Sequence, residues 1–94
     1  MKQPLQGRIS IPDGVLVREL QGESVLLNLN SESYFGLDDV GTRMWAVLTG
    51  SPSLEAAYET LLSEYDVAPE RLQADLRGFV ERLAELGLID LRDD

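Results

Sequence analysis

The fold is decided by residues 24–48, SVLLNLNSESYFGLDDVGTRMWAVL. In the first part of this stretch apolar residues alternate with other residues, a pattern typical of β-strands. It predicts one strand over residues 24–29 and another over residues 34–37. The polar residues 30–33 between them can bond to their own backbone and predict a turn. After Leu37 the apolar period changes to 3.6, which predicts a helix that Asp38 or Asp39 caps.

Toward the N-terminus, residues 15–20 predict a further strand, because they are apolar and rich in β-branched side chains. Gln21-Gly22-Glu23 then forms a tight turn, since Gly22 can adopt a positive φ. The three strands are expected to form an antiparallel meander. Residues 1–14 precede it as a polar lead-in, in which Ile9 and Ile11 allow one short strand.

Toward the C-terminus, the sequence predicts three helices with short connections. The first ends near Leu48, and the second begins at Ser53, a good N-cap, and stops near Asp66. The third runs from Pro69 to about Leu86, with Gly87 as a natural C-terminal cap. Residues 88–91 allow one last short strand.

Strands followed by helices indicate an α+β fold rather than βαβ units. Three short helices beside a three-stranded antiparallel sheet also describe a winged helix-turn-helix. The chain has 94 residues, so we expect one domain, over residues 15–91. Trp45 lies on the apolar stripe of the first helix and is expected in the core.

Composition excludes several classes of function. Seventeen Asp and Glu against eight Lys and Arg give a formal net charge of −9, which disfavours binding to nucleic acid or to an anionic membrane. The chain has no Cys and no His, which removes thiol nucleophiles, His-based triads and most transition-metal sites. The sequence therefore predicts a non-catalytic protein without metal or cofactor. With no spanning segment or signal peptide apparent, the cytoplasm is its expected location.

Several short pieces, in their order and spacing, resemble the PqqD-like family. They are VLLN (25–28), SYFGLD (33–38) with Trp45 beyond it, the central stretch 53–67, and the ending LAELGLI (83–89). The resemblance spans about residues 15–90. The chain departs from many relatives before its third strand, where they place Gly and this chain has Glu32 or Ser33.

The resemblance implies a winged helix-turn-helix that recognises the leader of a ribosomally made, post-translationally modified peptide. It implies that this leader pairs with the third strand and packs against the third helix. The free-standing form most resembles the recognition proteins of lasso-peptide pathways, whose partner is a separate leader peptidase. The alternative is the sister branch that serves a quinone-cofactor precursor.

The residues themselves offer such a site. The third strand is expected at the sheet edge, where a peptide can add as a further strand. Its alternation points Tyr34 and Gly36 one way, and Phe35 and Leu37 the other. On the third helix, Leu72 and Phe79 of the core stripe and Asp75 beside it would form the opposite wall. Arg71 and Arg82 would stand at its rim. The candidate peptide-binding residues are Ser33, Tyr34, Phe35, Gly36, Leu37, Arg71, Leu72, Asp75, Leu76, Phe79 and Arg82.

Plainer readings of the same residues stay open. Gly36 can mark a bulge, with both aromatic residues in the core. Arg71 and Asp75 can be a weak surface ion pair on a solvated helix face. The fold also permits a DNA-binding regulator, although residues 44–70 contain acids and no Lys or Arg. A monomer is expected, and an exposed edge strand that pairs with its own copy would instead give a dimer.

Overall fold

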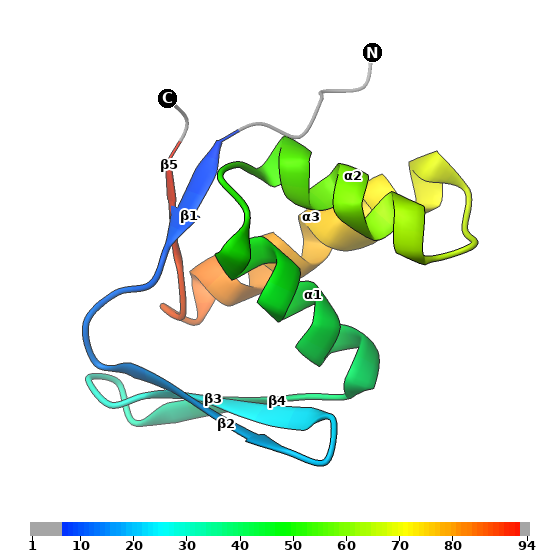
Figure 1. The fold of residues 1–94 in the computed structure, drawn as a ribbon. Helices are drawn as coiled ribbons and strands as arrows, with labels where there is room; N and C mark the ends of the chain where they lie inside the picture. Colours follow the sequence, from blue (N-terminus) through cyan, green and yellow to red (C-terminus); the bar gives the residue numbers. More distant parts are fainter. Residues whose placement is uncertain (1–6, 93–94) are drawn as a thin grey trace.

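The computed structural model describes residues 7–92. It confirms the α+β class, because a three-stranded antiparallel sheet is followed by three helices in a winged-helix-like arrangement (Figure 1). The elements are β1 Arg8–Ser10, β2 Val15–Leu20, β3 Glu23–Asn28, β4 Ser33–Leu37, α1 Asp39–Gly50, α2 Leu54–Glu64, α3 Pro69–Glu85 and β5 Asp90–Arg92.

The main sheet has the order β2-β3-β4, so β3 is central. Leu26 on β3 lies opposite Val17 on one side and Phe35 on the other. The C-terminal strand β5 does not join this sheet, because it pairs with β1, where Ile9 lies opposite Leu91. The strand expected near the C-terminus therefore leaves β4 at an edge. Strand β1 lies inside the segment that the sequence assigns to a polar lead-in.

The helices cover one face of the main sheet. Helix α1 lies across β3 and β4 and also packs on α2, while α3 packs on α2 (Figure 1). The core fills the space between these layers, and its largest fully buried side chains are Leu26, Leu48, Leu61, Leu76, Leu83, Leu88 and Ile89. Trp45 is 6% exposed, which confirms its expected place in the core.

The buried face of β3 is the more polar of its two faces. Ser24, Leu26 and Asn28 point toward the helices, while Val25 is 38% exposed on the opposite face. The two polar side chains are satisfied there: Ser24 Oγ lies 2.8 Å from Thr42 Oγ1, and Asn28 makes several hydrogen bonds described below. Burial is tolerated because each polar group has a partner.

Each helix begins where its sequence provides a suitable residue. Asp38 is the N-cap of α1, and its Oδ1 accepts a hydrogen bond from the Gly41 amide at 2.8 Å. Ser53 Oγ caps α2 by accepting from the Ala56 amide at 3.1 Å. Helix α3 begins at Pro69, which lacks an amide hydrogen where no intrahelical bond is needed.

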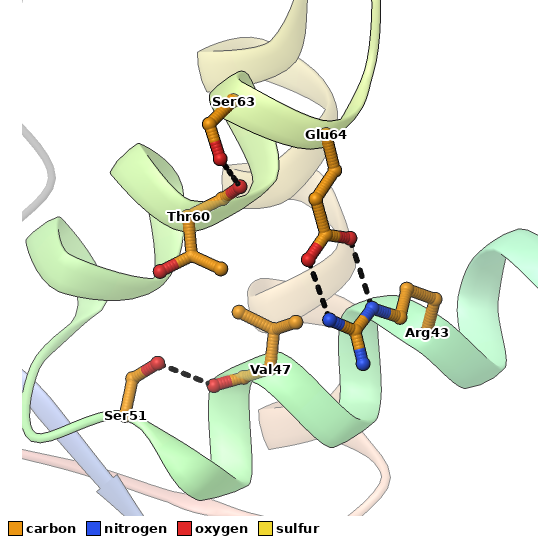
Figure 2. A network of polar contacts seen from close by, with 6 residues as sticks. All are labelled: Arg43, Val47, Ser51, Thr60, Ser63 and Glu64. Carbon is orange, nitrogen blue, oxygen red and sulfur yellow. Dashed lines mark hydrogen bonds and ion pairs between the residues drawn. The ribbon is translucent and has the colours of Figure 1, made fainter.

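An ion pair joins α1 to α2 on the surface. Arg43 Nε donates to Glu64 Oε1 at 2.9 Å, and Nη2 contacts the other carboxylate oxygen (Figure 2). The hydrogen bond from Arg43 and then its charge hold the pKa of the Glu64 carboxyl below its ordinary value, and the same contact raises the pKa of Arg43. Because both groups are exposed, the pair adds little to the free energy of folding and mainly orients α1 against α2.

The β2–β3 turn has a conformation that its first residue does not favour. Gln21 and Gly22 both adopt positive φ, at 56° and 84°, as a type I′ turn requires. Glycine accepts this conformation without cost, whereas glutamine does not, and asparagine accepts it better than most residues. The pairing of β2 with β3 therefore holds Gln21 in a backbone conformation that costs free energy.

Replacing Gln21 with Asn is expected to stabilise the fold by roughly 0.5–1 kcal/mol, because Asn-Gly suits a type I′ turn. Thermal unfolding followed by circular dichroism should show the midpoint rise by about 4 °C. Gly22→Ala is the matched control: a Cβ there meets no atom within 4 Å, so its expected destabilisation comes from the backbone alone. A lower midpoint for Gln21→Asn would contradict this reading of the turn.

Candidate functional site

An open groove of about 590 Å³ lies between β4 and α3, with the first turns of α1 as its floor. Its walls are largely apolar, and charged side chains stand at its rim. The lining residues are Phe35, Gly36, Leu37, Asp38, Val40, Gly41, Met44, Asp75, Phe79 and Arg82. We call this site the β4–α3 groove.

Strand β4 presents its two faces differently. Phe35 and Leu37 point toward the helices and line the groove, with Leu37 only 6% exposed. Tyr34 points to the opposite face and is 74% exposed, so it lies outside the groove. Ser33 is the first residue of β4, and its Oγ lies 2.7 Å from Ser31 Oγ in the preceding turn. The alternation expected along this strand is confirmed.

Helix α3 contributes Asp75, Phe79 and Arg82 to the groove. Phe79 is half-buried and packs against the core, while the two charged residues are exposed. Leu72 and Leu76, which the sequence also placed in the site, are 3% and 0% exposed. These two side chains lie in the core beneath the wall.

The remaining candidate, Arg71, lies at the end of the same wall. Its Nε is 3.4 Å from Asp75 Oδ2, in the i, i+4 arrangement. Both side chains are more than half exposed, so this ion pair is weak. Arg82 has a similar partner, with Nη1 3.6 Å from Glu85 Oε1. Both ion pairs leave Asp75 and Arg82 on the groove rim.

Sequence reasoning missed the floor of the groove. Val40, Gly41 and Met44 come from the start of α1 and fill the space below β4 and α3. A Cβ at Gly41 would lie 3.2 Å from Leu37 Cδ2, so this glycine permits α1 to approach β4 closely. The only signal in the sequence for these three residues is that they follow β4 directly. A helix that follows an edge strand without a connecting loop must begin beside that strand.

The edge of β4 is open along this groove. Among the described residues β4 pairs only with β3, because β5 pairs with β1. In an antiparallel edge strand, the N–H and C=O groups of every second residue point away from the sheet. A free strand edge beside an apolar groove can bind an extended chain through its backbone and through alternate side chains.

Two negative findings concern residues 7–92. No group of three or more acidic side chains there could hold a metal ion. None of the helices in that part of the chain is long and apolar enough to cross a membrane.

Comparison with known proteins assigns the fold to a family. The family model for coenzyme PQQ synthesis protein D (PqqD) matches residues 23–89, which contain β3, β4 and all three helices. The chain belongs to the PqqD family. This match confirms the resemblance found in the sequence, and it includes every residue that lines the β4–α3 groove. No curated protein matches the chain in sequence.

Two solved structures share this PqqD fold. One is TbiB1 in complex with the TbiA(beta) leader peptide, which is 36% identical, with a TM-score of 0.81 over 89% of this chain and 98% of that one. The other is a lasso peptide synthetase B1 complexed with its leader peptide, which is 24% identical, with a TM-score of 0.78 over 88% of this chain and 98% of that one. The second likeness supports the fold alone.

The turn before β4 contains Glu32, at the place where the resemblance leads one to expect a glycine. Glu32 adopts a positive φ of 58°, a conformation that glycine accepts without strain. The turn is therefore formed with a residue that favours this backbone conformation less than glycine would. The hairpin geometry is retained, because Asn28 still pairs with Ser33 across it.

Proposed function

We propose that this PqqD-family protein binds the leader of a ribosomally made precursor peptide in the β4–α3 groove. The observation that carries the proposal is the free edge of β4 beside an apolar groove, in a chain 36% identical to TbiB1, whose structure holds a leader peptide. The leader adds to β4 as a further antiparallel or parallel strand, and its alternate side chains enter the groove.

The physical properties of the groove suit this mode of binding. Backbone hydrogen bonds to β4 supply affinity that does not depend on the peptide sequence, so specificity comes from the side chains that enter the groove. Phe35, Leu37 and Phe79 offer apolar contact area there. A leader that is disordered when free loses entropy on binding, and the burial of apolar anchors offsets that loss.

The charges at the groove rim bear on the direction in which the leader lies in the groove. Asp75 and Arg82 are seven residues apart on α3, which places them roughly 10 Å apart along the helix axis. An acidic group therefore stands toward one end of the groove and a basic group toward the other. Such a pattern favours one orientation of a leader with complementary charges, and it affects the association rate more than the affinity.

We place the protein in lasso-peptide maturation, where it presents the bound leader to a separate leader peptidase. The likeness to TbiB1 supports binding of a leader peptide, and the resemblance found in the sequence favours the lasso-peptide branch. The second candidate is recognition of a quinone-cofactor precursor, which the match to the family model of coenzyme PQQ synthesis protein D favours. Both candidates use the same groove, and they differ in the precursor.

In this proposal the protein recognises and does not catalyse. A sequence without Cys or His offers no activated thiol and no imidazole base. A DNA-binding role is less compatible with the charges. Helix α2 carries Glu55, Glu59 and Glu64 and no Lys or Arg, so it would be repelled where a helix-turn-helix crosses the phosphate backbone.

Isothermal titration calorimetry with a synthetic leader tests the function directly. The neighbouring genes are searched for a short precursor; its leader half is the probe, and its core half is the control. We expect one leader to bind per chain, with amide shifts in NMR spectra concentrated in β4 and α3, and no binding of the core half. Absence of heat together with unchanged spectra at high peptide concentration would refute the proposal.

A further inference from the structure

One buried side chain, Asn28, connects both walls of the β4–α3 groove without lining it. Asn28 is the last residue of β3, is 8% exposed, and points toward the helices. Its carboxamide makes three hydrogen bonds within the chain. Few buried side chains of the described chain are polar, and this one contacts segments far apart in sequence.

The nitrogen of the carboxamide holds the end of α3. Asn28 Nδ2 donates to the carbonyl oxygen of Gly87 at 2.9 Å, across 59 positions of sequence. Gly87 adopts a positive φ of 73° where α3 ends, and the Leu88 amide donates to the Leu83 carbonyl at 2.9 Å, as in a Schellman motif. A Cβ at Gly87 would lie 2.9 Å from Asn28 Nδ2, so this glycine makes room for the contact.

The oxygen of the same carboxamide holds the turn that leads into β4. Asn28 Oδ1 accepts hydrogen bonds from the Asn30 amide at 3.0 Å and from the Ser31 amide at 3.3 Å. The backbone of Asn28 also lies opposite Ser33, the first residue of β4. One planar group of fixed size therefore joins the start of β4 to the end of α3.

We propose that Asn28 is a positioning residue for leader binding, which sets the separation of β4 and α3 and hence the width of the groove. The inference rests on the proposed function and adds a residue that the peptide does not touch. Strand addition needs the new strand at a fixed spacing from β4 while its side chains contact α3, so a small change in separation affects both sets of contacts at once.

The test compares two variants on the same buried face of β3. Asn28→Asp keeps the shape and the acceptor for the turn, but it places an oxygen against the Gly87 carbonyl and removes the donor. Ser24→Ala is the matched control, because it removes another buried polar contact between sheet and helix, to Thr42 on α1. Ser24 does not line the groove.

Leader affinity is measured at a temperature where all variants are folded by circular dichroism. We expect Asn28→Asp to weaken leader binding about tenfold, mainly through faster dissociation, and Ser24→Ala to leave the dissociation constant within about twofold. NMR spectra of free Asn28→Asp should also show shifts in both β4 and the last turn of α3. A structural role alone would instead lower stability in both variants and leave affinity unchanged.

Gly87→Ala disturbs the same contact at the Gly87 end. It replaces Asn28→Asp in the test if Asn28→Asp does not fold. It should weaken binding similarly, and the double variant should bind no more weakly than the weaker single variant. Wild-type binding with unchanged affinity in folded Asn28→Asp or Gly87→Ala would overturn the inference and leave the proposed function intact. Absence of wild-type binding would refute the proposed function, and the inference with it.

Discussion

Replacing Phe79 with Ala is expected to weaken leader binding by about thirtyfold, the effect of losing an aromatic contact at the centre of an interface. Phe79 lines the β4–α3 groove from α3 and faces the strand edge that the leader would join. It is half-buried in the free protein, so bound peptide would cover the remainder. Calorimetric titration with the synthetic leader measures the change.

Two controls separate this contact from general effects of substitution on α3. Glu81→Ala changes an exposed residue of the same helix outside the groove and should leave affinity unchanged. Asp75→Ala changes the groove rim and should have a smaller effect than Phe79→Ala, because exposed charges contribute little. Unchanged affinity in both groove variants, with the proteins folded, would show that the leader does not bind here.

Replacing Leu76 with Ala is expected to lower the free energy of unfolding by about 3 kcal/mol, because it leaves a cavity at a fully buried position. Leu76 is 0% exposed at the middle of α3. For a domain of this size the midpoint of thermal unfolding should fall by about 15 °C. Chemical and thermal unfolding followed by circular dichroism provide the measurement.

Leu20→Ala is the matched control for this prediction. It makes the same change at a side chain that is 76% exposed, where the expected loss is under about 0.5 kcal/mol. At low temperature, where Leu76→Ala is still folded, we expect its leader affinity to stay near the wild-type value. A large loss of affinity with little loss of stability would show that Leu76 contacts the peptide after all.

The candidate site could be predicted in part from sequence. Alternation along residues 33–37 separated Phe35 and Leu37 from Tyr34, since a strand has two faces regardless of its surroundings. Helical spacing places Phe79 on the core stripe of α3 and Asp75 beside it. It does not show where the groove ends and the core begins, so Leu72 and Leu76 on the same stripe are candidates although both are buried.

The sequence by itself determined the order of strands and helices, their caps and the acidic charge, because periodicity and capping depend on nearby residues. Only the tertiary structure decided which face of β3 is buried, because the alternation in the sequence also allows the more apolar face to pack against the helices. It also decided that β5 pairs with β1 and leaves β4 free. The contact between Asn28 and Gly87 likewise depends on how distant segments pack, and no local pattern records it.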